Sequence, residues 1–347
     1  MEWVRGETIG HGTFAEVSLA KPINQINSCF PELVAVKSCD VAQSDSLVKE
    51  CKILKELKDC PEIINCYGDS ITVENGEKLY NVVLEYASGG CLSDKVKSSE
   101  NLKLSEHDVR RYSCSILKAI KFIHQKGFVH CDIKLDNILV FNNDDVKIAD
   151  FGLARKTAED SKLRYDIRGT PFYMAPETVN GGQQKPASDV WAFGCLVLEM
   201  LTGQPVWGCI DDVCVLFMKI GVGAEIPEIP REISEAGKDF LGKCFVKDSS
   251  KRWTAEMLLE HPFIINGIDQ TTCSSDCSPR NPFDFHEWEL DEPVSPVWPV
   301  ESESESESEF EGWNGDEICV LSRSRLRELA NNVRLDWSDR SSWINVR

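Results

Sequence analysis

The segment from His130 to Val140 constrains the fold of this chain more than any other, because it places three functional side chains among apolar residues. Asp132 can accept a proton from a hydroxyl group, Lys134 can neutralise a phosphoryl group during its transfer, and Asn137 can offer an oxygen to a magnesium ion. Thirteen residues after Asn137, the tripeptide Asp150–Gly152 adds a second carboxylate and a glycine that permits a sharp turn. These groups together predict a two-metal site for phosphoryl transfer.

The order of three motifs, H-x-D-x-K-x-x-N, D-F-G and A-P-E, resembles the signature of the protein kinases. The resemblance extends from about residue 3 to residue 263. It implies an α+β, two-lobed protein kinase fold, with a small β-rich N-lobe over about residues 3–86 and a large helical C-lobe over about residues 88–263. It also implies ATP and Mg²⁺ as cofactors, Asp132 as the catalytic base, Lys134 as a catalytic residue, and Asn137 and Asp150 as the metal ligands.

The segment from Ile9 to Val17 has two glycines at the tip of a hairpin pattern, where backbone N–H groups can approach phosphates because no Cβ blocks them. A Gly-x-Gly pattern alone is weak, since a plain tight turn has the same composition, and Ala15 replaces the third glycine of the kinase pattern. The resemblance implies that nucleotide contacts come from Ile9, Gly10, His11, Gly12 and Val17.

Residues 34–37 form an apolar strand pattern that carries Lys37, a residue that would ordinarily extend to solvent. The next segment is a predicted helix, and Glu50 lies at the edge of its apolar stripe, which consists of Leu47, Cys51, Leu54 and Leu57. A solvated glutamate is the alternative, although the neighbouring lysines fit a solvated face better. By resemblance, Lys37 holds the α- and β-phosphates of ATP and pairs with Glu50.

Residues 81–87 form a predicted buried strand that runs into the glycine-rich bend at residues 88–90. By resemblance this is the hinge between the lobes, with Leu84 behind the adenine and the backbone of Glu85 and Ala87 bonded to it. Ala35 and Leu139 are placed in the same nucleotide site. The composition fits any strand-to-helix turn, so the assignment depends on position alone. The segment 21–32 is predicted to be a surface loop.

A predicted helix begins with the capping sequence at Ser105 and closes at Gly127. His107 and His124 show no pattern around them and are predicted to lie on the surface, whereas His130 is predicted to be a structural anchor. A strongly apolar helix then starts at Asp189, and that carboxylate is predicted to hold the backbone of the catalytic loop.

The polar segment between Asp150 and Glu177 is a predicted activation loop, where phosphorylation can change local order. Thr157 and Tyr165 are predicted to be unmodified. By resemblance, Thr170 bonds the catalytic Asp and Lys and helps to select Ser/Thr substrates. Arg252 is predicted to pair with Glu177.

The formal charge of −19 argues against nucleic-acid and anionic-membrane partners. The fifteen cysteines are scattered, no C-x-x-C pair is present, and no signal peptide precedes Trp3, so a reducing intracellular compartment is expected. A zinc site at Cys273 and Cys277 is disfavoured. The longest apolar run, near residues 190–201, is too short for a membrane span of about 20 residues. The expected location is the cytoplasm, with the nucleus left open.

Residues 264–347 form an acidic tail that carries −11, with a Glu-Ser repeat over residues 301–309 that cannot bury itself and is expected to be disordered. Five of the nine tryptophans lie there: Trp288, Trp298, Trp313, Trp337 and Trp343. Two interpretations remain open. The tail is either a regulatory or docking segment for a partner, or a loose tether that packs on the kinase domain.

Residues 169–177 and the turn at residues 60–64 resemble the MEKK-type mitogen-activated protein kinase kinase kinases of plants. This resemblance implies a protein substrate, a MAP kinase kinase that is phosphorylated on Ser/Thr in its activation loop. Two alternatives remain. A pseudokinase scaffold is disfavoured by the complete set of catalytic groups, and a Ser/Thr kinase of another pathway stays open.

Overall fold

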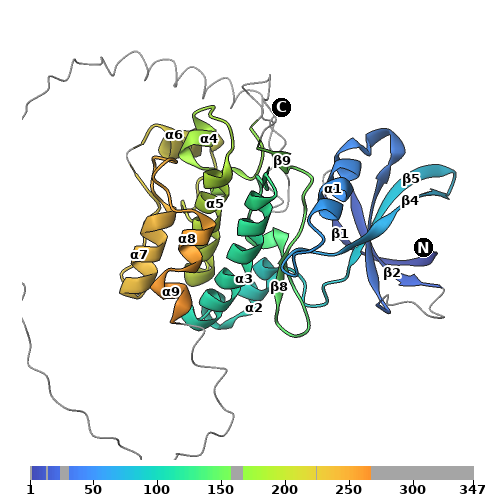
Figure 1. The fold of residues 1–347 in the computed structure, drawn as a ribbon, viewed down its shortest axis with the longest axis horizontal. Helices are drawn as coiled ribbons and strands as arrows, with labels where there is room; N and C mark the ends of the chain where they lie inside the picture. The colour runs from blue at the N-terminus through green and yellow to red at the C-terminus, as the bar shows by residue number, and fades with distance from the viewer. Residues whose placement is uncertain (1, 13–14, 24–30, 158–166, 224, 267–347) are drawn as a thin grey trace, which may run out of the picture.

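The computed structural model describes residues 2–12, 15–23, 31–157, 167–223 and 225–266. The tail beyond Asn266 and the centre of the activation loop therefore lie outside the described residues. Within those limits the chain divides into a strand-rich part and a helical part, as Figure 1 shows. No helix of the described ranges is long and apolar enough to span a membrane.

The strand-rich part is an antiparallel sheet of five strands in the order β1-β2-β3-β5-β4. Its strands are β1 (Trp3–His11), β2 (Glu16–Pro22), β3 (Val34–Asp40), β4 (Cys66–Glu74) and β5 (Glu77–Glu85). Successive residues of β3 and β5 point to opposite faces of the sheet, so one face closes over a small apolar cluster of Ala20, Val34, Val36 and Val83. The other face, with Ala35 and Leu84, joins the main core.

Helix α1 (Asp45–Glu56) packs beside this sheet, close to β4 (Figure 1). Its predicted stripe is buried, and Glu50, only 2% exposed, is buried with it. The helical period therefore placed this carboxylate correctly. One detail differs from the sequence prediction: Lys21 and Pro22 belong to β2, opposite Val4 and Trp3, and not to a surface loop.

The helical part is built around α5 (Pro186–Thr202), which is apolar on nearly all sides and almost wholly buried. Around it lie α2 (Leu92–Ser98), α3 (Glu106–Gln125), α4 (Pro176–Val179), α6 (Val213–Gly221), α7 (Glu235–Cys244), α8 (Ala255–Leu259) and α9 (Pro262–Ile265). Single 3-10 turns occur as η1 (Val41–Gln43), η2 (Glu100–Leu102), η3 (Leu135–Asn137) and η4 (Pro171–Tyr173).

Both ends of α5 have a local cause. The helix begins at Pro186, three residues before the predicted Asp189, because a proline fits the first turn, where its missing N–H costs nothing. It ends at Gly203 with φ of 68°, and a Cβ there would lie 1.9 Å from the Leu102 carbonyl oxygen. Only glycine satisfies both the left-handed backbone and the close approach.

Short strand pairs connect the two parts. Strand β6 (Phe128–Val129) pairs with β9 (Arg155–Lys156), and β7 (Ile138–Val140) pairs with β8 (Val146–Ile148). The loop between β6 and β7 contains His130, Asp132 and Lys134, and the loop between β8 and β9 contains Asp150. The two pairs therefore bring the predicted catalytic motifs to the junction between the sheet and the helices.

Candidate active site

The loop after β6 is held from below by Asp189 on α5. One oxygen, Oδ2, accepts the His130 backbone N–H at 2.9 Å, and Oδ1 accepts the Cys131 N–H at 2.9 Å. Cys131 has φ of 69°, a strained conformation that these two bonds stabilise. Burial would raise the pKa of Asp189, but its hydrogen bonds to His124 and to the loop hold that pKa below the usual range. The predicted anchoring role of Asp189 is confirmed.

His124 does not lie on the surface, and that prediction was wrong. Its Nε2 lies 2.8 Å from Asp189 Oδ2, and its side chain is 13% exposed. The signal was present in the helical period, because His124 follows the buried residues Ile116 and Ile120 at spacings of four. The prediction missed this burial because His124 is polar, and an apolar helical stripe is not expected to end in an imidazole.

His130 is an anchor, as expected. Its Nδ1 accepts the Asp132 backbone N–H at 3.2 Å, and its Nε2 lies 3.2 Å from the Ala149 carbonyl oxygen. The ring also packs edge-on against Phe151 at 4.8 Å between centroids. These contacts connect the catalytic loop to the segment that carries Asp150.

Asp132, Lys134, Asn137 and Thr170, here called the Asp132 cluster, form one bonded group. Asp132 Oδ1 accepts the Thr170 hydroxyl at 2.8 Å and the Thr170 backbone N–H at 3.0 Å, and its Oδ2 accepts Asn137 Nδ2 at 2.9 Å. Lys134 Nζ donates to the Thr170 hydroxyl at 3.0 Å and lies 3.3 Å from Asp132 Oδ2. The carboxylate is buried and fixed in orientation, as a group that receives a proton in a defined direction must be.

Thr170 reaches Asp132 because Gly169 precedes it. Gly169 has φ of 106°, and a Cβ there would lie 2.3 Å from the Cys131 carbonyl oxygen. The glycine lets the end of the activation segment lie directly on the catalytic loop. The bonds between Thr170, Asp132 and Lys134 that the resemblance implied are therefore present.

Lys37, Glu50 and Asp150, here called the Lys37 cluster, join three elements. Lys37 Nζ donates to Glu50 Oε2 at 2.7 Å and to Asp150 Oδ1 at 3.1 Å. The predicted Lys37–Glu50 pair is confirmed. Burial would lower the pKa of Lys37, but the two carboxylates together hold it above its usual value, and Lys37 in turn keeps the pKa of buried Asp150 low. Burial raises the pKa of Glu50, and its pair with Lys37 counteracts that rise.

The two predicted metal ligands are neighbours through the backbone. The Ala149 N–H donates to the Asn137 carbonyl oxygen at 2.9 Å, which places Asp150 beside Asn137. Asn137 Nδ2 donates to the Asp132 backbone oxygen at 2.8 Å and to its carboxylate, so its amide oxygen is the atom left for a cation. No group of three or more His, Cys, Asp or Glu side chains gathers as a metal site within the described residues.

Strand pairing places the predicted nucleotide-binding residues on neighbouring strands. Ala35 lies opposite Leu84, and each of the two residues is 7% exposed. Val17 lies between two predicted contacts, opposite Lys37 on one side and Gly10 on the other. Leu139 lies on β7, where it bridges Cys91.

The ends of the nucleotide site are less closed. Gly12 N–H donates to the Ala15 carbonyl at 2.7 Å and closes the hairpin, whose tip residues 13–14 lie outside the described part. Ile9 and His11 are exposed at the end of β1. Glu85 donates its N–H to the Asn65 carbonyl at 2.9 Å, so only its carbonyl is left for a ligand, and Ala87 follows the end of β5.

Two buried contacts hold the segment after Thr170. Arg252 makes a bidentate pair with Glu177 at 2.7 and 3.0 Å, which confirms the predicted pairing. Tyr173 donates its phenol hydrogen to Glu199 on α5, and burial raises the pKa of Glu199 to about 7. The Tyr173–Glu199 contact was not predicted, because a polar residue inside the apolar α5 pattern gives no hint of its partner.

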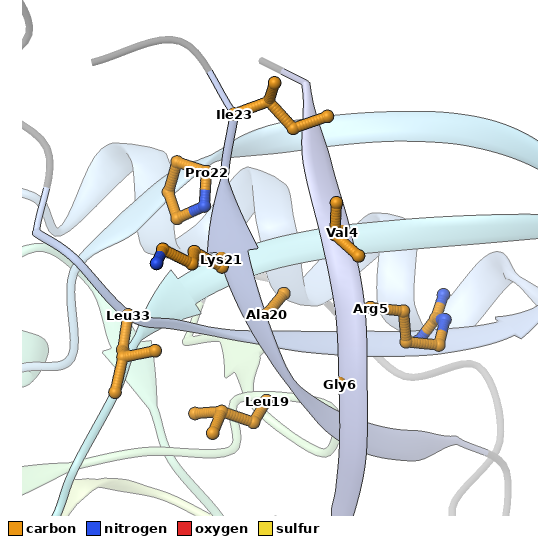
Figure 2. Close-up of a pocket in the computed structure, with 9 residues that line it drawn as sticks. All are labelled: Val4, Arg5, Gly6, Leu19, Ala20, Lys21, Pro22, Ile23 and Leu33. Atoms are coloured by element: carbon orange, nitrogen blue, oxygen red, sulfur yellow. The ribbon is translucent and has the colours of Figure 1, made fainter.

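A cavity of about 430 Å³ lies elsewhere, on the edge of the sheet (Figure 2). Val4, Leu19, Ile23 and Leu33 surround it, from β1, β2 and the chain before β3. None of the residues of the two clusters lines it, so it is separate from the candidate active site.

The sequence comparisons agree with this geometry. The model of the protein kinase domain matches residues 3–264, so the chain belongs to the protein kinase family, and the two-lobed α+β fold is confirmed. Mitogen-activated protein kinase kinase kinase 20 of Arabidopsis thaliana is 46% identical over 366 residues, which covers 100% of both chains. Kinase kinase kinases 17 and 18 of the same plant are 40% and 42% identical over 78% and 77% of this chain, and 71% and 78% of their own. The chain is a serine/threonine kinase that uses ATP.

Proposed function

We propose that this protein is a mitogen-activated protein kinase kinase kinase, which transfers the γ-phosphoryl group of ATP to a Ser or Thr hydroxyl in the activation loop of a MAP kinase kinase. The similarity to a kinase kinase kinase over the whole of both chains carries this proposal. The intact Asp132 and Lys37 clusters support it, since a scaffold without catalysis has no need of two bonded sets of charged groups at one junction.

Asp132 accepts the proton of the substrate hydroxyl. Its two oxygens are oriented by Thr170 and Asn137, so a lone pair faces the incoming hydroxyl without a search of side-chain conformations. Lys134, 3.0 Å from the Thr170 hydroxyl, places a positive charge next to the transferring phosphoryl group. Thr170 thereby ties the catalytic base to the segment that faces the substrate, which supports the Ser/Thr specificity.

Lys37 holds the α- and β-phosphates, and Glu50 orients it. Lys37 stays protonated because Glu50 and Asp150 both face it. Ala35, Leu84 and Leu139 would hold the adenine, and the Glu85 carbonyl and the Ala87 N–H would supply hydrogen bonds to it. The glycine-rich hairpin covers the phosphates through Ile9, Gly10, His11, Gly12 and Val17.

Asn137 and Asp150 would hold Mg²⁺. The residues fit this ion, because Mg²⁺ is usually bound through one or two protein oxygens together with substrate phosphates, and the Asn137 amide oxygen and the Asp150 carboxylate supply them. When bound, the ion neutralises the charge that develops on the phosphate oxygens. Lys37 holds Asp150 ionised, which keeps that ligand ready for the cation.

Purified protein incubated with ATP, Mg²⁺ and a panel of kinase-inactive MAP kinase kinases tests the proposal. We expect incorporation of phosphate on Ser/Thr of the activation loop of at least one of them, located by mass spectrometry. Asp132→Asn is the control that shows the phosphate comes from this enzyme. Phosphorylation of generic substrates alone, with none of the kinase kinases modified, would assign the enzyme to another pathway.

We also infer that the tail docks a protein substrate or regulator. Helix α9 extends to Ile265, and Ile264 is 1% exposed, so a truncation that keeps the domain whole ends at Asn266. We expect this truncation to leave kcat/KM for a generic peptide within about twofold, while KM for the MAP kinase kinase rises. Unchanged kinetics with every protein partner would contradict a docking role.

For the location we propose the cytoplasm, with entry into the nucleus. The eleven described cysteines are all free thiols, and seven of them are buried, which supports a reducing compartment. A fluorescent fusion of the full chain in plant cells tests this. Fluorescence confined to an organelle other than the nucleus would contradict it.

A further inference from the structure

Two cysteines that the catalytic mechanism does not use lie against each other beside the Lys37 cluster. Cys51, on α1, and Cys66, the first residue of β4, have their sulfur atoms 3.8 Å apart. Cys51 is 1% exposed, whereas Cys66 is half-buried and therefore open to a small reagent. The fold brings these two thiols together from positions fifteen residues apart.

The Cys51–Cys66 pair lies where a bond between its sulfur atoms would affect the position of α1. Cys51 is the neighbour of Glu50, whose carboxylate reaches Lys37 at 2.7 Å only while α1 stays beside the sheet. In the described arrangement, the two sulfurs approach each other while Glu50 is bonded to Lys37. A covalent bond between the sulfurs therefore fits the catalytic position of α1.

We propose that Cys51 and Cys66 are a site of oxidative modification, where a peroxide forms a disulfide that fixes α1 to β4 with Glu50 on Lys37. The sulfurs need to approach by about 1.8 Å to reach the S–S distance of about 2.05 Å.

The chemistry balances with hydrogen peroxide as the oxidant. The Cys66 thiolate attacks one peroxide oxygen, the O–O bond breaks, and the hydroxide that leaves takes up a proton to give water and a sulfenic acid on Cys66. The Cys51 sulfur then attacks the Cys66 sulfur, the S–O bond breaks, and the oxygen leaves as a second water with the Cys51 thiol proton. Two thiols and one peroxide give one disulfide and two waters.

The surroundings make the first step slow at neutral pH. Burial raises the pKa of Cys66 to about 12, and burial together with Asp69 on β4, 3.5 Å from the Cys51 sulfur, raises that of Cys51. Lys55 on α1 and Tyr80 on β5 both bond Asp69, and Lys55 only partly offsets its charge. The thiolate is the reactive form. At pH values below the thiol pKa, the rate should therefore rise about tenfold for each unit by which the pH is increased.

The test is peptide mapping of the full chain after treatment with hydrogen peroxide at pH 7 and pH 9, quenched with an alkylating agent. Trypsin cuts at Lys49, Lys52 and Lys58, so the expected product is the tripeptide 50–52 joined to the peptide 59–78. The second peptide also contains Cys60, so fragmentation must place the bond on Cys66. Cys60→Ser removes the ambiguity.

We expect the crosslink in the wild type, in Cys60→Ser and in the matched control Cys209→Ser, which alters an exposed cysteine, and no such crosslink in Cys66→Ser or Cys51→Ala. It should form about a hundredfold faster at pH 9 than at pH 7, and a thiol reductant should reverse it. The crosslinked enzyme should keep phosphotransfer to a generic peptide within about twofold and unfold at a higher temperature, because the bond restricts the unfolded chain.

Three results would overturn the proposal: no joined peptide at either pH, a bond between other cysteines in its place, or a crosslinked enzyme with more than tenfold lower activity, which would show that the bond displaces α1. Peptide mapping detects the crosslink by mass and needs no kinase substrate. A negative mapping result would therefore leave the proposed substrate class unaffected.

Discussion

The Asp132 cluster and the Lys37 cluster lie beside each other in the candidate active site, but the fold holds them by different means. The loop that carries Asp132 is bonded to the buried helix α5 through Asp189, and each member of the Asp132 cluster bonds another over distances of 2.8 to 3.3 Å. In the Lys37 cluster, Lys37 bonds Glu50 on α1 and Asp150, and Glu50 Oε1 also accepts the Phe151 backbone N–H at 3.3 Å. The first is therefore part of the core, and the second depends on how α1 lies.

This difference separates stability from activity. Asp189 lies 2% exposed beneath the catalytic loop, so removing it disturbs both the fold and the site. Lys37 contributes a charge in the middle of β3, a strand whose packing comes from Ala35 and the valines. Changes in the Lys37 cluster should therefore affect catalysis far more than folding.

The largest expected effect comes from the two clusters themselves. Asp132→Asn removes the proton acceptor and Lys37→Met removes the charge on the phosphates, so each should lower kcat/KM by about 10³-fold or more. Both variants should fold, since Asn can keep the two bonds that Asp132 Oδ1 accepts from Thr170, and methionine fills the space of the lysine stem. Circular dichroism with a kinase assay measures both properties. Near-normal turnover of either variant would remove that residue from its assigned role.

Asp189→Ala tests the support of the Asp132 cluster, and it should lower the stability of the fold as well as the activity. It leaves the N–H groups of His130 and Cys131, and the His124 ring, without their acceptor, which costs about 3–5 kcal/mol of unfolding free energy. Urea unfolding measures that cost. His124→Ala is the matched variant, and it should cost less because Asp189 keeps its two backbone bonds. If Asp189→Ala lost activity without losing stability, the two clusters would not differ as described.

Glu199, on the buried helix α5, allows the stability of the core to be tested through its dependence on pH. Burial raises its pKa from 4.5 to about 7, so the folded state holds this proton more tightly than the unfolded chain does. The stabilisation is complete below about pH 4.5 and is lost as the pH rises to about 7, by at most about 3 kcal/mol. Unfolding free energies of wild type and Glu199→Gln at pH 5 and pH 8 measure it. The variant should lack that loss, and equal pH dependence in both would contradict the raised pKa.

The sequence predicted the parts of the site that short patterns specify. The spacing of Asp132, Asn137 and Asp150 lies within contiguous motifs, and Glu50 was found because a helical period of 3.6 residues aligns it with buried neighbours. Both depend on local geometry, which the chain itself encodes. The resemblance supplied the bonds of Thr170, which no local pattern contains.

The missed features have two physical causes. His124 was hidden because a polar residue on a buried helix face is satisfied by a partner 65 positions away. The start of α5 shifted to Pro186 because a proline in the first turn outweighs the capping preference of Asp189. The Cys51–Cys66 contact needed the packing of α1 on β4. The partners of His124 and of Cys51 are decided by tertiary contacts, whereas the start of α5 is decided locally by its proline.

The smallest expected effect concerns Cys131, which stands where most regulated kinases have an arginine that binds the phosphorylated activation loop. Its thiol donates weakly to the Val129 carbonyl at 3.6 Å, and burial raises its pKa even though Arg155, Arg168 and Lys49 lie close enough to lower it. A neutral thiol cannot replace a phosphate–arginine contact, which contributes about 1.5–3 kcal/mol and a coupling of about 10–150-fold.

We therefore expect phosphatase treatment of active enzyme to lower its activity by less than about tenfold, and Cys131→Arg to increase that dependence. Arg155 and Arg168 offer the alternative, since their charges surround the position of the missing arginine, whereas Ser161 and Arg164 lie outside the described residues. The measurement is kinase activity before and after phosphatase, with rephosphorylation as the control. A loss well beyond tenfold that rephosphorylation at Ser161 or a neighbour restores would show that another cation binds the loop phosphate. The activity of the Asp132 cluster would then depend on loop phosphorylation. The two clusters would differ less in how firmly the fold holds them.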